Sequence, residues 1–257
     1  MKKIIWFISV FLIPVIAYTQ EKGALGVEFN ASHNQYSMDE FNESVDNVNS
    51  SSSLILISNE FSEITSGMGY GLSINLQLSD CFNVGVYGDY LLGKSENEFM
   101  YISGGEFGTP IDTSYWTRHF EVNSLILGLK SSFFISKSAF WKKYDWLSNV
   151  ESTIDVGIGY SFSSSILYNI IRDKDKVKGT GKEINKVNGF HLKSQFKIGY
   201  IISKNTHFSS IGLKIGYQYL QTSQLKGGEF SYFFTKENAP RLNFSGLTAG
   251  IYLTFGK

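Results

Sequence analysis

The last twelve residues, GLTAGIYLTFGK, alternate without a break between apolar and small or polar side chains. Successive side chains of a β-strand point to opposite faces, so this segment predicts a strand with one hydrocarbon face and one face of small or hydrogen-bonding groups. In a soluble protein the hydrocarbon face must pack on an apolar layer, whereas in a lipid-embedded barrel the bilayer covers it. The solvent that this face meets therefore decides the fold class.

The first residues of the chain predict a secretory signal peptide over 1–19. Lys2 and Lys3 precede an apolar stretch, and small residues follow at the usual cleavage offsets. A membrane anchor is the alternative, but the stretch is shorter than the roughly 20 apolar residues that a spanning helix needs. We therefore expect cleavage before Gln20, export of the mature chain, and a single β-barrel domain over 20–257.

Composition narrows the class of protein further. Lys and Arg together number 23, as do Asp and Glu, so the formal net charge is zero and nothing indicates a nucleic-acid partner. Cys81 is the only cysteine, which excludes an intrachain disulfide and a cysteine metal site. Proline is scarce while glycine, tyrosine and phenylalanine are abundant, which favours strands over helices.

The alternation seen at the end of the chain recurs in eight segments. These segments are 23–36, about 67–78, 82–93, 117–135, 149–163, 189–202, 208–221 and about 242–256. Short links alternate with long polar ones: the short links are 79–81, about 136–148 and 203–207, and the long ones are 37–65, 94–116, 164–188 and 222–240. This rhythm predicts an all-β fold, an eight-stranded antiparallel up-and-down transmembrane β-barrel with short periplasmic turns and long extracellular loops.

The segment 117–135 has an ambiguous register. Its large apolar residues from Leu125 onward fall on odd positions, whereas Phe120 and Val122 fall on even positions. We expect either a β-bulge near Asn123–Ser124 or an upper strand end that lies outside the membrane.

A soluble eight-stranded barrel of the lipocalin kind also alternates, but it turns its apolar face inward. The apolar face here carries more large residues than such a lumen holds, and the opposite face is rich in glycine, which suits a crowded interior. Aromatic residues cluster at both ends of the strands, as expected of interfacial girdles. Those near the long loops are Tyr36, Tyr70, Tyr90, Tyr160, Tyr217 and Tyr219, and those near the short turns are Phe82, Phe133, Trp141, Trp146, Tyr200, Phe208 and Phe255.

Charged residues on the polar face predict a lumen closed by ion pairs. The acids come from the first, third and fifth strands, and the lysines come mostly from the sixth and seventh. Eight strands leave an interior that side chains just fill, and buried charges must be paired. We therefore expect an internal ion-pair network of Glu28, Asp89, Lys130, Glu151, Asp155, Lys193, Lys197 and Lys214. A proton or ion path is the functional alternative.

The chain resembles the small outer-membrane β-barrels of the OmpA/OmpX-like superfamily of Gram-negative bacteria. It is most similar in pattern to the Bacteroidota-type "outer membrane protein beta-barrel domain" (porin-like) family. The resemblance rests on the signal with Gln20 at its cleavage site, on FEVNSLILGLKSSFF with its inward Lys130, and on the closing GLTAGIYLTFGK. It implies a cell outer membrane location, and we expect the chain to lack the peptidoglycan-binding domain of OmpA-type proteins.

No residue pattern indicates catalysis, a metal site or a cofactor. The histidines are dispersed, at His33, His119, His191 and His207. His119 and Glu121 share a face near the outer end of their strand, where a hydrolase-like site with a serine could form. Polar residues at the mouth of a barrel explain the same pattern, and we favour that interpretation.

Two classes of function remain open. The first is a non-enzymatic barrel whose long loops bind an extracellular or membrane-protein partner or serve surface and envelope integrity. The second is a small porin or channel, and a membrane-barrel enzyme or a component of secretion machinery comes third. We expect a monomer in contact with outer-membrane lipid.

Overall fold

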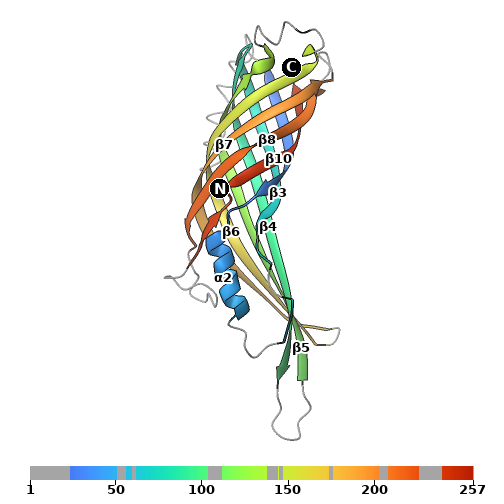
Figure 1. The fold of residues 1–257 in the computed structure, drawn as a ribbon, viewed down its shortest axis with the longest axis vertical. Coiled ribbons are helices and arrows are strands. Elements are labelled where there is room, and N and C mark those ends of the chain that lie inside the picture. The colour runs from blue at the N-terminus through green and yellow to red at the C-terminus, as the bar shows by residue number, and fades with distance from the viewer. Residues whose placement is uncertain are drawn as a thin grey trace, which may run out of the picture.

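The structure, a computed structural model, describes residues 24–50, 56–59, 62–103, 112–137, 144, 147–173, 176–202, 208–225 and 239–256. Its framework is a ring of eight antiparallel strands (Figure 1). The ring strands are β1 (Leu25–Gln35), β3 (Ser66–Ser79), β4 (Phe82–Ser103), β5 (Asp112–Phe134), β6 (Val150–Asp173), β7 (Lys176–Ile201), β8 (Phe208–Gln224) and β10 (Gly246–Gly256). Because β10 pairs with both β8 and β1, the sheet closes on itself, and the predicted eight-stranded barrel is confirmed.

Four short elements accompany the ring. β2 (Leu56–Asn59) pairs with β4, and β9 (Arg241–Asn243) pairs with β8. A helix, α2 (Asp39–Ser50), follows β1, and a 3-10 turn, η1 (Ile135–Lys137), follows β5. No helix in the described part of the chain is long and apolar enough to cross a bilayer.

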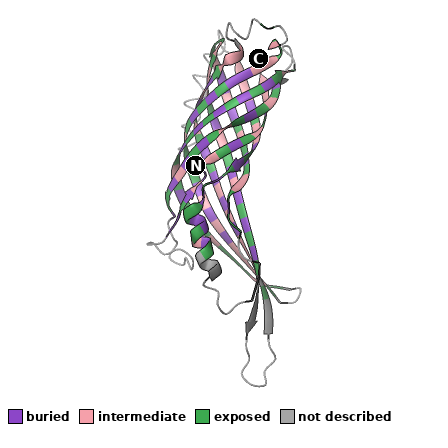
Figure 2. Cartoon of the chain, in the orientation of Figure 1, coloured by how far each residue is buried: buried purple, intermediate pink, exposed green. Residues whose placement is uncertain are grey.

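The two faces of the barrel wall differ in the way that a lipid-embedded barrel requires. Large apolar side chains point outward, as Leu213 (63% exposed) and Leu129 (56% exposed) show, while Glu28 and Lys197 are buried inside. Exposed and buried residues alternate along the strands of the barrel (Figure 2). The soluble, lipocalin-like alternative is therefore wrong, because its apolar face would lie inside.

Most of the exposed large apolar residues form a band around the barrel. The band covers 82–92 of β4, 125–133 of β5 and 154–162 of β6. Tilted strands of roughly 9–11 residues span the hydrocarbon core of a membrane. Within that core every backbone N–H and C=O must be paired, which the closed ring achieves. The fold is therefore that of an outer-membrane β-barrel, with the band embedded in lipid.

The segments 94–116 and 164–188 are not polar loops, as the sequence predicted, but mostly strand. β4, β5, β6 and β7 continue well beyond the lipid band as a projecting four-stranded sheet. Along β4 the apolar alternation ends with the band, because the outward residues above it, such as Lys94 and Glu96, meet water instead. The hydropathy pattern therefore did not indicate these outer strand segments, although their backbone pairing continues from the barrel.

The bulge expected near Asn123–Ser124 is also absent from the structure. β5 keeps one register with β4 and with β6 through this point. Phe120 and Val122 lie on the same inward face as Lys130 and are buried. The other expectation for this segment, an upper strand end outside the membrane, fits the unbroken register, because there the interior of the sheet becomes apolar.

The link 37–65 contains structure that the sequence analysis did not predict. Asp39 and Glu40 lie in the first turn of α2, where acidic side chains suit the positive end of the helix dipole. Phe41 and Val45, one turn apart, are buried. In Figure 1 the helix lies at the same end of the barrel as the projecting tip of β4 and β5. This end is the extracellular one.

The lipid band yields a test with matched residues. Val156 and Val177 are both outward valines, 52% and 59% exposed, but only Val156 lies in the band. We expect Val156→Arg to destabilise the barrel by about 2–4 kcal/mol, the cost of arginine at the bilayer midplane, and Val177→Arg to have almost no effect. Urea unfolding in lipid vesicles, followed by the heat-dependent gel shift, measures both. Equal losses would contradict the assignment of the band.

Candidate functional site

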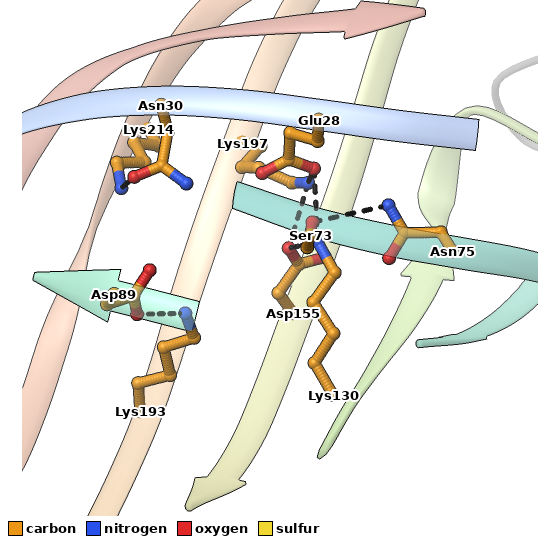
Figure 3. A network of polar contacts seen from close by, with 10 residues as sticks. All are labelled: Glu28, Asn30, Ser73, Asn75, Asp89, Lys130, Asp155, Lys193, Lys197 and Lys214. Atoms are coloured by element: carbon orange, nitrogen blue, oxygen red, sulfur yellow. Dashed lines mark hydrogen bonds and ion pairs between the residues drawn. The ribbon is translucent and has the colours of Figure 1, made fainter. Parts of the chain in front are cut away.

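A ring of four alternating charges crosses the lumen (Figure 3). Glu28, Lys130, Asp155 and Lys197 come from β1, β5, β6 and β7 and are all buried. Nζ of Lys130 lies 3.1 Å from Oε2 of Glu28 and 3.5 Å from Oδ2 of Asp155. Nζ of Lys197 lies 2.7 Å and 2.8 Å from the same two oxygens. Each charge thus has two partners of opposite sign, which is what buried ions require.

A second group of charges lies beside this ring. Nζ of Lys193 donates to Oδ2 of Asp89 over 2.6 Å and lies 3.6 Å from the centre of the Tyr87 ring, a cation–π contact. Nζ of Lys214 donates to Oδ1 of Asn30 over 2.6 Å. The two lysines therefore differ, because Lys193 contacts a carboxylate and Lys214 contacts a neutral amide (Figure 3).

Tyr87 fills the lumen next to the charges. Its hydroxyl lies 2.8 Å from Nδ1 of the buried His191. Its ring lies over glycines of the neighbouring strands: a Cβ added at Gly128 would come within 2.6 Å of the ring, and one at Gly159 within 2.7 Å of the hydroxyl. Glycine at these positions is therefore what lets a tyrosine cross the interior.

Tyr252 fills the opposite side in the same way. It is 1% exposed, and a Cβ added at Gly212 would lie 2.7 Å from its ring. Gln195 and Gln218 are buried in the lumen as well. Two tyrosines, two glutamines and the charged groups together fill an interior that eight strands leave only wide enough for side chains.

Toward the extracellular end the interior is closed by an apolar plug. We use this name for the buried apolar cluster that continues upward from Tyr87 and consists of Tyr36, Met38, Phe41, Val45, Ile64, Leu91, Phe120, Val122, Ile126, Leu167, Val187, Leu220, Leu225, Ala239, Leu242 and Phe244. Helix α2 contributes the Phe41 ring, which meets Phe120 of β5 edge-to-face at 5.7 Å. The plug therefore joins the helix to the inner side of the projecting strands.

Polar contacts fix α2 on the plug. Oδ1 of Asn42 accepts a hydrogen bond from the backbone N–H of Ile64 at 2.9 Å. Oε2 of Glu40 accepts one from the N–H of Arg241 in β9 at 3.1 Å. The helix is thus bound both to the chain that returns to β3 and to the chain that leads to β10.

Of the eight residues predicted for the ion-pair network, the structure places Glu28, Asp89, Lys130, Asp155, Lys193 and Lys197 in carboxylate–lysine contacts. Lys214 contacts Asn30 instead. Glu151 shares the inward face of β6, is half-buried, and lies nearer the periplasmic end, opposite Gly199.

The aromatic residues fall into three groups. Those that the structure exposes on the outer wall are Tyr70, Tyr90, Tyr160, Tyr217, Tyr219, Phe82, Phe133 and Tyr200. Tyr70 lies opposite Tyr90 and Phe82 opposite Phe133, one pair at each end of the band. Phe255 is half-buried and meets Phe29 at 5.8 Å. Trp141, Trp146 and the Phe208 side chain lie outside the described residues.

The assignment of Tyr36 to a girdle was wrong. Tyr36 is buried in the apolar plug, where its ring meets Phe244 edge-to-face at 5.1 Å. Its hydroxyl donates to the carbonyl oxygen of Leu92 at 3.3 Å. Tyr36 directly follows β1 and shares the even phase of the buried Glu28 and Asn34, so the alternation itself indicates an inward side chain. The girdle assignment rested only on its place at the end of the strand.

The histidines do not form one site. His33 lies on the outer wall and His191 in the lumen, while His207 lies outside the described residues. His119 and Glu121 both point outward from β5, but they have different partners. Nδ1 of His119 lies 3.6 Å from Oε2 of Glu96, and Glu121 lies 3.6 Å from Nζ of Lys94.

Besides α2, two features of the extracellular end were not predicted from the sequence. The first is the apolar plug, although Phe120 and Val122 share the phase of the inward Lys130 and could have indicated it. The second is the outward face of the projecting sheet, where charged and aromatic residues lie side by side. The described residues contain no group of three or more His, Cys, Asp or Glu side chains that could hold a metal ion.

No family model matches the sequence, and no curated protein matches it. The chain is similar to several solved structures. OprG of Pseudomonas aeruginosa is 10% identical with a TM-score of 0.42, over 91% of this chain and 96% of that chain. Neisserial surface protein A (NspA) is 14% identical with a TM-score of 0.38, over 91% and 99%. The N-terminal β-barrel domain of Pseudomonas aeruginosa OprF is 11% identical with a TM-score of 0.31, over 91% and 100%. Similarities this low carry no conclusion about the function or the site of this chain.

The two kinds of lumen lysine lead to a matched test. Lys197→Met removes two carboxylate contacts and leaves Glu28 and Asp155 with one lysine between them, so we expect a loss of about 3–5 kcal/mol of unfolding free energy. Lys214→Met removes only an amide contact and should cost clearly less. Adding Glu28→Gln to Lys197→Met should recover part of the loss, because the remaining charges balance. Unfolding in vesicles measures all three, and a larger loss for Lys214→Met than for Lys197→Met would overturn the ring.

The docking of α2 can be tested separately from the ring. Phe41→Ala leaves a cavity beneath the helix, and truncation of a buried phenylalanine typically costs about 3–5 kcal/mol. We expect faster hydrogen exchange in α2 and unchanged exchange in the lipid-embedded strands. Glu43→Ala, at an exposed position of the same helix, is the control and should change neither. Uniform exchange changes throughout the barrel would contradict a separately docked helix.

Proposed function

We propose that this protein is a closed, non-enzymatic outer-membrane barrel that holds a rigid sheet outside the cell for binding. The sheet consists of the projecting parts of β4, β5, β6 and β7, which continue the barrel wall. In this proposal the barrel is an anchor, and the extracellular surface is the working part.

The observation that carries the proposal is the filling of the interior at successive levels. The ring of Glu28, Lys130, Asp155 and Lys197 is fully paired, and Tyr87 and Tyr252 occupy the space beside it. The apolar plug then covers the extracellular end. An ion would need both a water path through the charged levels and a path through hydrocarbon, and transfer of an ion into hydrocarbon is very unfavourable.

The other functions have less support from the geometry. A small porin would need an open lumen, and the described interior is packed. An enzyme on the outer rim would need a nucleophile beside His119, but His119 contacts Glu96 and the ring of Tyr168. The signal peptide, the Bacteroidota-type family and a role in secretion machinery stay predictions.

Conductance across a planar bilayer tests the proposal. We expect the native protein, inserted after folding in detergent, to give no steady openings, whereas a porin of known conductance in the same bilayer does. Phe41→Ala combined with Phe120→Ala thins the plug and leaves the ring intact, so this variant should also remain closed to ions. Steady nanosiemens openings of the native barrel would overturn the proposal in favour of a small porin.

A further inference from the structure

The outward side of the projecting sheet is a surface with a definite pattern. We call it the extension face, formed by the outward side chains of 94–98 in β4, 115–121 in β5, 166–172 in β6 and 177–186 in β7. One row of this face runs straight across all four strands, because Glu96 lies opposite His119, His119 opposite Tyr168, and Tyr168 opposite Lys182. Neighbouring side chains of this row also contact one another. The rings of His119 and Tyr168 are 6.1 Å apart, and Nζ of Lys182 lies 5.0 Å above the Tyr168 ring.

Negative charge gathers at the β4 edge of the extension face. Glu96, Glu98 and Glu121 point outward there, with Lys94 as the one described cation among them. Lys94 forms an ion pair with Glu121 on the neighbouring strand, with Nζ 3.6 Å from Oε2. The side chain of Glu96 remains more than half exposed although it faces His119.

Positive charge gathers at the β7 edge. Arg172, Lys182 and Lys186 are exposed, and their cross-strand neighbours are neutral. Arg172 lies between Tyr115 and Val177, and Lys186 lies opposite Ser164. Opposite charges that stabilise a sheet lie directly opposite each other. These cations have no acidic cross-strand neighbour among the described outward residues, so the β7 edge presents unbalanced positive charge.

Apolar side chains separate the two charged edges. Ile166, Tyr168 and Ile170 of β6 are half-buried, and Ile184 of β7 is 44% exposed although it lies above the lipid band. An apolar centre with a charged rim is the common composition of protein interfaces.

The membrane restricts how two copies can meet through this face. Both barrels must keep their extracellular ends on the same side, so a two-fold axis between them has to run along the membrane normal. Rotation about that axis preserves height above the membrane and exchanges left and right. The acidic β4 edge of one copy then faces the basic β7 edge of the other, and the same match repeats on the opposite side of the axis.

We propose that the extension face is a homodimer interface, with Ile166, Tyr168, Ile170 and Ile184 near its centre and the two charged edges in reciprocal contact. A face with acid at one edge and base at the other is complementary to itself under this one rotation, and this favours a second copy over an unrelated partner. The inference departs from the expected monomer. It also deepens the proposed function, on which it rests, because it names the partner of the displayed sheet.

Charge reversal provides a test that does not depend on the barrel being closed. One variant carries Glu96→Lys with Glu98→Lys, and a second carries Lys182→Glu with Lys186→Glu. Each opposes like charges at both contacts of a homodimer. In a mixture of the two variants, however, every contact again joins opposite charges. All four positions are exposed and lie above the lipid band, so the barrel itself is unaffected, which the heat-dependent gel shift checks.

The readout is energy transfer between dyes on Cys81, the only cysteine of the chain, in vesicles of high lipid-to-protein ratio. We expect transfer for the native protein, its loss in each variant alone, its return in an equal mixture of the variants, and its return in the quadruple variant. Glu43→Lys, on the exposed side of α2, is the matched control and should keep native transfer. Absence of transfer in the native protein, or transfer that survives in both single-edge variants, would overturn the dimer. Neither result bears on conductance, so the two proposals fail separately.

Discussion

The pairing of β1 with β10 is the constraint on which the remaining structure depends. Residues 26–34 of the first strand lie opposite 248–256 of the last, so the ladder has no free edge within the lipid band. In hydrocarbon an open edge would leave a row of unpaired N–H and C=O groups, each costing several kcal/mol. The ring of this protein closes after eight strands, and eight strands leave a lumen that only side chains can occupy.

That narrow lumen explains the chemistry of the inward residues. A charge inside it cannot be solvated, so Glu28 and Asp155 each contact Lys130 and Lys197. Large side chains also need space in this lumen, and Tyr87 lies where Gly128 and Gly159 leave room for its ring. Above the membrane the sheet opens from the ring, and apolar residues with a helix replace ions as the filling.

Period-two alternation was sufficient to predict the barrel, its closure and the inward charges from the sequence. It worked within the band because lipid and lumen impose opposite preferences on successive residues. It failed above the band, where Lys94 and Ser95 are both polar although one faces outward and the other is buried inside. Above the band the backbone pairing continues, but successive outward and inward residues no longer differ in hydropathy, so the sequence does not reveal the strand. Helix α2 was missed because it is a short helix within a polar link. Tyr36 was misassigned because it was placed by its nearness to a strand end, although it shares the even phase of the inward Glu28 and Asn34.

Continuity of the long strands has a mechanical consequence. Lys130 and Phe120 belong to one unbroken strand, as do Asp155 and Leu167 of β6 and Lys197 and Val187 of β7. No hinge lies between the ion-pair ring and the surface that projects from the cell. A pull or twist applied outside is therefore transmitted along hydrogen-bonded backbone to the middle of the membrane, whereas a mobile loop would absorb it. The projecting sheet and the barrel therefore form one continuous unit, because the same four strands, β4 to β7, run through both.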